Sequence, residues 1–394
     1  MKVFEDFHII DWILLGTLLV LFLAQIYWYA RYMCAPARKM RKDKKLKAKS
    51  QEPIAEMPGV SVVLCAHNEA YNISNYLQVL LTQDYPEYEV IVVDDGSEDE
   101  TRAMIERYMV HDPRLHMTFV PYGARVGSTK KLALTLAAKA AKYDYLLLTD
   151  ADCVPESNQW IRTMMAAFQR PTTNDQQPID IVLGFSPYFI EKGHVNRLIR
   201  FDTLFNGLHY LGDALCGHPY MGVGRNLAYR KSLFFESGGF THSMTSKAGD
   251  DDLFVNHTAT KANTAVAVLR EGYMWSLPKQ TMKEWIQQKR RHLSVSPNYR
   301  LGTKIRLLME PLTRGLFYAA VLYVVISYQV SVVSLVALGL FLLRWIIQTM
   351  ILNISARKMG TKRFCMASVL WFDITLPLVN LWMLIVPKRK NSKW

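Results

Sequence analysis

Hydrophobic residues form long runs at both ends of this chain and short runs in between. Residues 12–30 are an uncharged apolar run of about the length that crosses a lipid bilayer. Three further long apolar runs lie near the other end, at residues 312–327, 330–354 and 365–386. The pattern predicts a transmembrane anchor over residues 1–31 and a membrane region with two or three transmembrane helices over residues 301–394.

Between these segments, short β-branched runs alternate with stretches of helical periodicity. The expected strands are residues 60–65, 89–93 and 145–149, and the expected helices are residues 70–81, 99–109 and 130–142. This alternation predicts an α/β domain with a parallel sheet and crossover helices over residues 59–300, after a basic juxtamembrane linker over residues 32–58. Because ligands of open α/β sheets bind outside the carboxyl ends of the strands, polar clusters at those ends are candidate functional residues.

The formal net charge of +13 is concentrated beside the apolar runs. Residues 31–50 carry +8 and residues 388–394 carry +4, whereas residues 51–387 carry +3. Such placement favours anionic lipid as a partner over nucleic acid, which would need a basic face on the folded domain. The five cysteines form no C-x-x-C pair, which argues against a disulfide framework or a zinc site and fits a reducing compartment.

The charge bias gives conflicting predictions for the two ends of the membrane region. The basic run after the first span places the domain over residues 59–300 in the cytoplasm. Three later spans would then leave the tail outside, whereas the basic residues 388–390 favour the inside. Either one later segment is re-entrant or interfacial, or the tail departs from the charge bias.

Polar side chains follow each of the first two expected strands. Asn68 and Glu69 come after the first strand, and Asp94 and Asp95 come after the second, where Gly96 permits a tight turn. A carboxylate in such a position can accept a hydrogen bond from a nucleobase or from a ribose hydroxyl. An Asp-Gly-Ser sequence is also an ordinary turn and helix cap, so this cluster alone leaves both interpretations open.

Two acids, Asp150 and Asp152, follow the third expected strand. Carboxylates two positions apart in an extended segment project to the same side and repel each other. A hard divalent cation that holds a diphosphate would compensate this repulsion. A solvated acidic loop is the alternative interpretation.

Two more charged clusters lie further along the chain. Three consecutive acids at 250–252 precede Leu253 and indicate either a functional carboxylate or the first turn of a helix, where acids are favoured. The basic segment 287–292 is preceded by Trp285. Its cations could stabilise a pyrophosphate leaving group, or the segment could lie on the membrane as a basic amphipathic stretch.

These five clusters, in this order, resemble the family 2 glycosyltransferases with a GT-A fold, over residues 58–300. The frame of one leading and several trailing helices is similar to that of the membrane-embedded cellulose and hyaluronan synthases. The resemblance implies that Asp94 and Asp95 contact the nucleobase and ribose, and that Lys130 begins a nucleotide-contacting helix. The full set of nucleotide-contacting positions that it implies is Asn68, Glu69, Asp94, Asp95, Lys130 and Asp150.

The resemblance also implies which residues carry the chemistry. Asp150 and Asp152 match the D-x-D motif that holds a divalent cation, Mg²⁺ or Mn²⁺, with Asp152 in direct contact. Asp250 or Asp251 matches the acid that supplies the general base, and the flanking residues leave the choice between them open. The acceptor-side segment of the family is matched by residues 222–229 and 238–240.

Gln287, Arg290 and Arg291 match the family's Q-x-x-R-W motif, except that Arg291 replaces the tryptophan. In the synthases that tryptophan is a platform for the terminal sugar of the growing polymer. An arginine there favours an acceptor that bears phosphate or carboxylate, and the transfer of one or a few sugars. The alternative is that Trp285 or His292 provides the platform.

Taken together, the resemblance implies an inverting glycosyltransferase. It would move a sugar from a nucleotide-sugar donor, a UDP-sugar, to a lipid-linked or saccharide acceptor at the cytoplasmic face of the plasma or inner membrane. The implied partners are donor, acceptor and membrane lipids, without nucleic acid. A processive polysaccharide synthase is one alternative, and a catalytically dead nucleotide-binding protein or a transporter is another. From the sequence we count only three ionisable groups in or beside the spans, Asp11, Arg344 and Asp373, which argues against a transporter.

Overall fold

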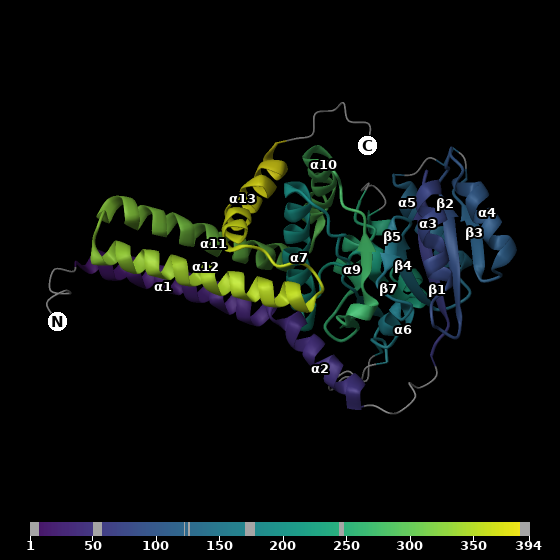
Figure 1. Cartoon of the computed structure of the whole chain (residues 1–394), viewed down its shortest axis with the longest axis horizontal. Helices are drawn as coiled ribbons and strands as arrows, with labels where there is room; N and C mark the ends of the chain where they lie inside the picture. The colour runs from purple at the N-terminus through teal and green to yellow at the C-terminus, as the bar shows by residue number, and fades with distance from the viewer. Residues whose placement is uncertain are drawn as a thin grey trace. The chain divides into compact units, whose positions relative to one another are not determined.

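The computed structural model describes residues 8–49, 57–121, 123–124, 127–169, 178–243 and 248–386. The basic tail and residues 50–56 of the expected linker lie outside these residues. The chain divides into two compact units, a helical unit of residues 1–37 and 300–394 and a sheet unit of residues 38–299 (Figure 1). The domain boundaries expected at residues 31, 58 and 300 stay predictions.

A seven-stranded mixed sheet, in the order β3-β2-β1-β4-β7-β6-β8, forms the centre of the sheet unit. The first four strands along the chain are parallel: β1 (Val60–Ala66), β2 (Tyr88–Asp94), β3 (Leu115–Phe119) and β4 (Tyr145–Asp150). The remaining strands are β6 (Ile181–Leu183), β7 (Leu227–Arg230) and β8 (Thr264–Val266). Because β7 runs antiparallel to both β4 and β6, the sheet is mixed, whereas the alternating pattern had indicated parallel strands alone.

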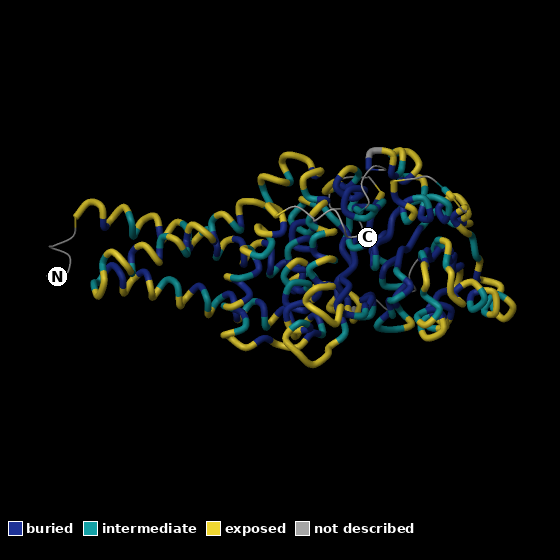
Figure 2. Tube along the Cα trace, turned by 90° about the horizontal axis from the view of Figure 1, so that it is seen from above, coloured by how far each residue is buried: buried dark blue, intermediate teal, exposed yellow. Residues whose placement is uncertain are grey.

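Apolar periodicity explains how the helices cover the sheet. The helix α3 (Ala70–Leu81) buries Ile73, Leu77 and Leu80, which recur at the spacing of one helical face. Every residue of β2 is buried, as expected for a central parallel strand, and Figure 2 shows the buried positions in dark blue. The other crossover helices are α4 (Thr101–His111), α5 (Thr129–Ala140) and α6 (Trp160–Met165).

The rest of the sheet unit adds a small second sheet and four helices. The strand β5 (Cys153–Pro155) directly follows Asp152 and pairs with β9 (Met274–Ser276). The helices are α7 (His194–Leu215), α8 (Lys231–Glu236), α9 (Asp252–Thr258) and α10 (Met282–Leu293). A capping box starts α10, because the Thr281 side chain accepts from the backbone N–H of Glu284 and the Glu284 carboxylate accepts from that of Thr281.

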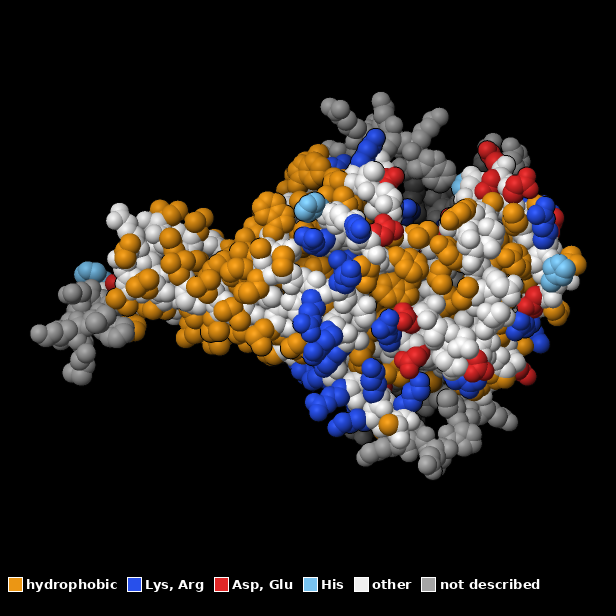
Figure 3. Space-filling view, in the orientation of Figure 1, with side chains coloured by type: hydrophobic (Ala, Val, Ile, Leu, Met, Phe, Trp, Pro, Cys, Tyr) orange, Lys and Arg blue, Asp and Glu red, His pale blue; other side chains and the backbone are white. Residues whose placement is uncertain are grey.

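Four helices within the described residues are long and apolar enough to cross a membrane. The first begins with α1 (Ile9–Trp28) and continues through a π-helical turn at Tyr29–Met33 into α2 (Ala35–Lys49). The others are α11 (Leu301–Tyr328), α12 (Val332–Lys358) and α13 (Met366–Ile385). Large apolar side chains cover these helices, while Lys and Arg side chains gather on α2 (Figure 3). This surface is what a lipid-facing helix bundle requires.

Charged side chains meet inside the helical unit. The Asp373 carboxylate binds the Arg314 guanidinium at 2.7 Å through one oxygen and that of Arg344 at 3.0 Å through the other. Arg314 also binds Glu310 at 2.9 Å, so two arginines face two acids. Glu310 and Arg314 both lie in α11, so the count of three ionisable groups made from the sequence is wrong. The side chains of Glu310, Arg314, Arg344 and Asp373 are each 8 % exposed or less.

Neutral side chains complete this set of contacts. Gln348 donates to Asp373 at 2.6 Å, and Arg344 donates to the Tyr29 hydroxyl at 2.7 Å and to the Gln25 side chain at 3.1 Å. We call Gln25, Tyr29, Glu310, Arg314, Arg344, Gln348 and Asp373 the helical network. Its members come from all four long helices, so the network joins them through buried hydrogen bonds.

Candidate active site

The loops after β1 and β2 tie to each other at the carboxyl edge of the sheet. Asp94 is 5 % exposed, and its carboxylate accepts a hydrogen bond from the Ser97 backbone N–H at 3.0 Å. Asp95 is more exposed and accepts from the Thr129 hydroxyl at 2.6 Å. Gly96, at φ +69°, makes the turn that follows these two acids. Asp94 therefore shapes this loop, whereas Asp95 lies where a ligand could reach it.

Asn68 and Glu69 occupy the neighbouring loop. Asn68 adopts φ +56°, and its side-chain oxygen accepts from the backbone N–H of Glu98 at 2.8 Å. Burial raises the pKa of Glu69, and the negative charges of Asp152 and Asp150 raise this pKa further. A hydrogen bond that the Asn72 amide donates to the Glu69 carboxylate has the opposite effect. Glu69 thus faces the D-x-D acids, while Asn68 braces the loop.

Lys130, in the first turn of α5, joins two of the predicted acids. Its ammonium lies 2.9 Å from the Asp150 carboxylate and 3.5 Å from that of Asp250. Burial opposes the lysine's charge, but Asp150 and Asp250 raise the pKa of Lys130 well above its usual value. The fold therefore brings together a lysine and two acids that are far apart in the sequence.

Asp150 and Asp152 lie on the same side of the chain after β4. One ligand atom from each of them and the Cys153 sulfur all lie within 4.8 Å of one another. Burial would raise the pKa of Asp150, but Lys130, helped by Arg225 and Arg291, holds it below the usual range. Burial and the adjacent acids raise the pKa of Cys153, whose thiol donates to Asp152 at 3.3 Å.

This donor set fits a hard divalent cation. Two carboxylates offer the oxygen ligands that Mg²⁺ and Mn²⁺ prefer, and a cation would offset the repulsion between them. The protonated Cys153 acts instead as a hydrogen-bond donor that orients Asp152.

The acids at 250–252 differ in how they are held. Asp251 caps α9, with one carboxylate oxygen accepting from the Asp252 N–H at 2.8 Å and the other from the Gly224 N–H at 2.7 Å. Burial and the charge of Asp250 raise the pKa of Asp251 to about 6, against the opposing effect of Lys130. The Asp250 side chain is 14 % exposed and faces Lys130. Asp251 is therefore tied to the backbone at both oxygens, and Asp250 is paired with a side chain.

Lys131 was not among the residues predicted from the sequence. It is fully buried and donates to the carbonyl oxygens of Ser243, at 2.5 Å, and Ala248, at 3.0 Å. These carbonyls precede the acids at 250–252 in the sequence. Of the two consecutive lysines of α5, Lys130 therefore binds acidic side chains and Lys131 binds the backbone that leads to the acids at 250–252. The sequence signal was the Lys-Lys pair at the start of an expected helix.

Among the predicted residues of α10, Arg291 acts electrostatically on the acids of the site. Gln287 and Arg291 are exposed and Arg290 is half-buried, and the positive charge of Arg291 contributes to lowering the pKa of Asp150. Lys289, which the sequence analysis passed over, binds both carboxylate oxygens of Asp202 in α7 at 2.7 Å. Trp285 is 4 % exposed, so its ring packs inside the sheet unit.

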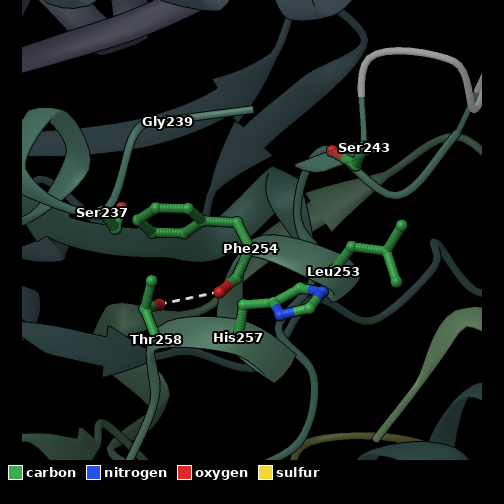
Figure 4. A pocket seen from close by; sticks show the side chains of 7 residues that line it. All are labelled: Ser237, Gly239, Ser243, Leu253, Phe254, His257 and Thr258. Carbon is green, nitrogen blue, oxygen red and sulfur yellow. Dashed lines mark hydrogen bonds between the residues drawn. The ribbon is translucent and has the colours of Figure 1, made fainter. Parts of the chain in front are cut away.

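A small cavity of about 160 Å³ lies against α9 (Figure 4). Its lining residues are Ser237, Gly239, Ser243, Leu253, Phe254, His257 and Thr258. The Thr258 hydroxyl donates to the Phe254 carbonyl at 2.7 Å along one wall. The lining contains none of the described strand-end acids, so the cavity is separate from the candidate active site.

Part of the sheet unit matches a known protein family. Residues 61–235 match the family model described as glycosyl transferase family 2. Residues 61–235 therefore form a family 2 glycosyl transferase domain within the sheet unit.

Two curated relatives and one solved structure are similar to the chain. Poly-β-1,6-N-acetyl-D-glucosamine synthase of Staphylococcus epidermidis is 32 % identical over 99 residues, which is 25 % of this chain and 23 % of that protein. Probable glycosyltransferase YdaM of Bacillus subtilis is 24 % identical over 246 residues, 62 % of this chain and 56 % of that protein. The matches thus span about a quarter to about half of these relatives.

The solved structure is the mannosyltransferase PcManGT from Pyrobaculum calidifontis in complex with GDP-Man and Mn²⁺. It superimposes with a TM-score of 0.52 at 20 % identity, covering 86 % of this chain and 98 % of that one. At this identity the likeness establishes the fold.

Proposed function

We propose that this protein is an inverting glycosyltransferase that transfers a sugar from a nucleotide-sugar donor to a lipid-linked or saccharide acceptor at the cytoplasmic face of the membrane. The observation that carries the proposal is the Lys130 ammonium placed between Asp150, at 2.9 Å, and Asp250, at 3.5 Å. This one contact joins the end of β4, the start of α5 and the acids before α9 at the edge of the sheet where ligands bind.

Asp250 is the general base in this proposal. It would take the proton of an acceptor hydroxyl while that oxygen attacks the anomeric carbon and the bond to the diphosphate breaks on the opposite side. Asp251 is less suited, because backbone N–H groups occupy both of its carboxylate oxygens and cap α9. Lys130, Arg290 and Arg291 would stabilise the negative charge of the departing diphosphate.

Asp150 and Asp152 would hold the divalent cation, Mg²⁺ or Mn²⁺, with Asp152 in direct contact. The clustering of their oxygens supports this, as does the Mn²⁺ named with GDP-Man in PcManGT. When bound, the cation would neutralise charge on the donor's diphosphate.

The donor and the acceptor are tested by a screen. Resemblance favours a UDP-sugar, while PcManGT is named with GDP-Man, so both nucleotide series belong in it. Membranes containing the full-length protein would receive each labelled donor, and mass analysis would identify the product. Transfer from a nucleotide sugar, absent with Asp250→Asn membranes, supports the proposal. If no donor in either series is consumed, the proposal is wrong.

A processive polysaccharide synthase is the second candidate, favoured by the name of the staphylococcal relative. Against it stands Arg291, which replaces the aromatic platform, and the burial of Trp285, which leaves that ring unable to serve as one. The size of the product separates the two. Short, lipid-extractable products support transfer of one or a few sugars, and long polymer made from donor alone supports the synthase.

The cytoplasmic orientation of the sheet unit rests on the basic surface of α2. In a cysteine-free background, Lys45→Cys should resist an impermeant thiol reagent in intact cells. Val330→Cys, in the connection between α11 and α12, is 95 % exposed and should react from outside. The reverse labelling pattern would invert the proposed topology.

A further inference from the structure

The turn before β7 brings Arg225 to the end of β4. In the antiparallel β4–β7 pair, Leu148 is opposite Leu227. Arg225 lies two residues before Leu227, in the 3-10 turn Gly224–Asn226, and this turn contacts β4, which ends at Asp150. Arg225, which belongs to the segment 222–229 that the resemblance matched to the acceptor side, therefore lies near the D-x-D acids.

The turn that carries Arg225 is held from both sides. Asn226 is fully buried, and its amide donates to the carbonyls of Phe185, at 2.8 Å, and Gly272, at 2.9 Å, while it accepts from the Trp160 indole at 3.0 Å. On the other side, the Gly224 N–H donates to Asp251 at 2.7 Å. The backbone of Arg225 is thus fixed between a buried anchor and the acids of the site.

The side chain of Arg225 lies on an aromatic platform. Its guanidinium carbon is 4.4 Å from the centre of the Tyr188 ring, a cation–π distance. The Tyr188 hydroxyl accepts from Gln288 at 3.1 Å, and Tyr188 forms a β-bridge with Ser276 of β9. Ser276 in turn pairs with Cys153, the residue after Asp152. The platform therefore belongs to the same small sheet as the residues that follow the metal-site acids.

Most of the donors of Arg225 are available to a ligand. Within the described part of the chain, its guanidinium donates to one carbonyl, that of Ser186 at 3.3 Å, out of five N–H groups. Its charge also contributes to lowering the pKa of Asp150. A planar cation with free donors, beside acids that suit a divalent cation, matches the geometry of a phosphate group.

We propose that Arg225 binds the diphosphate of the nucleotide-sugar donor, and that Tyr188 is the positioning residue that holds its guanidinium toward that diphosphate. The inference rests on the proposed function, since it assigns a contact within the same donor site. It predicts that charge at position 225 matters for phosphate and not for the nucleoside.

Calorimetric binding with the full-length protein in detergent tests this directly. The probes are uridine, UMP and UDP, with the guanosine series in parallel, each with Mg²⁺ and in excess chelator. Arg225→Met should weaken UDP or GDP binding at least about 10-fold and leave nucleoside binding unchanged, because a hydrogen bond to a charged group is lost. Arg225→Lys keeps the charge but loses the planar guanidinium, so its affinity for UDP or GDP should lie between those of Arg225→Met and wild type.

Arg230→Met is the matched control. Arg230 lies at the other end of β7, with its guanidinium 5.1 Å from the centre of the Tyr145 ring and its Nε 3.4 Å from Asp180. Like Arg225, it stacks on a tyrosine ring, but it lies at the end of β7 that is away from the acids. Its loss should leave the affinities for nucleoside and diphosphate in their wild-type ratio.

The platform is tested by two substitutions. Tyr188→Phe keeps the ring and should retain diphosphate affinity, whereas Tyr188→Leu should lose it without changing nucleoside affinity. If Arg225→Met loses affinity equally for the nucleoside and for the nucleoside diphosphate, the role of Arg225 is structural and the inference is wrong. Unchanged affinity for the nucleoside diphosphate would also overturn it. If wild type binds no nucleotide at all, the proposed function fails together with the inference; if wild type binds and Arg225→Met binds equally, the inference alone fails.

Discussion

Charged side chains gather both at the sheet edge and among the long helices, and the two groups differ in how far their charges are matched. At the sheet edge, the acids Asp150, Asp152, Asp250 and Asp251 outnumber the cations near them, Lys130, Arg225 and Arg291. In the helical network, Arg314 and Arg344 face Glu310 and Asp373, so the formal charges balance. Unmatched charge costs stability unless a ligand compensates it, whereas a matched network holds structure together.

The same contrast appears in the hydrogen bonds. Each carboxylate oxygen of Asp373 has an arginine and a further side chain as partners. Asp152, in contrast, accepts from the weak Cys153 thiol donor at 3.3 Å and is half-buried. The first arrangement is complete without a ligand, and the second is suited to receive a cation. We therefore interpret the sheet edge as a binding site and the helical network as a structural element that joins the long helices.

The largest effect should come from removing the divalent cation that Asp150 and Asp152 are suited to hold. Excess chelator should reduce sugar transfer to background, and added Mg²⁺ or Mn²⁺ should restore it, because Asp150 and Asp152 repel each other and the diphosphate without it. Asp152→Asn should weaken metal-dependent nucleotide binding about 10-fold or more. Thermal unfolding in chelator should leave the helical unit unaffected. Full activity in excess chelator would contradict the interpretation that the sheet-edge acids, unlike the helical network, need a cation.

Unbalancing the helical network should come next. Asp373→Asn leaves two arginines against Glu310 and should cost about 3–5 kcal/mol, since one partner of a buried pair is removed. The measurement is thermal unfolding and yield of the full-length protein in detergent. Nucleotide affinity of the protein that does fold should remain at the wild-type level.

The control for Asp373→Asn is Glu106→Gln, which breaks the exposed Arg102–Glu106 pair and should change stability by less than about 1 kcal/mol. A stable Asp373→Asn protein with lost nucleotide binding would assign the network to ligand binding instead.

The third effect separates two neighbouring acids. Asp250→Asn should reduce kcat on the order of 100-fold while donor binding and Tm remain, as expected for a general base. Asp251→Asn should act mainly on stability, because it replaces an N-cap that accepts two backbone hydrogen bonds. Kinetics and thermal unfolding of both variants give the comparison. If the two profiles are exchanged, Asp251 is the base, and normal turnover in both contradicts the assignment altogether.

The smallest effect concerns pH. Because burial and Asp250 raise the pKa of Asp251 to about 6, its protonated form is favoured in the folded protein. Its contribution to stability is fully present below the unfolded value near 4 and is lost as the pH rises through about 6. Between pH 4 and 7 the Tm of ligand-free wild type should therefore fall by a few degrees relative to Asp251→Asn. Parallel curves for the two proteins would contradict a raised pKa.

Much of the fold was predictable because local patterns encode it. The helix at residues 70–81 matches α3, and the expected strands match β1, β2 and β4 to within a residue at either end. Alternating β-branched runs and amphipathic stretches specify βαβ units, and long apolar runs specify membrane-length helices, without reference to distant residues. Strand-end acids were found for the same reason, since chain order alone places them after strands.

The tertiary structure decided which of these residues meet. The antiparallel insertion of β7 beside β4 brings Arg225 to Asp150, and nothing in the local sequence specifies that pairing. The partners in the helical network lie on different helices, so an isolated Arg314 or Asp373 in a hydrophobic run gives no sign of the other. Sequence determines the elements because their hydrophobic periodicity is local. The choice among Asp250, Asp251 and their partners depends on strand order and packing, which only the folded chain provides.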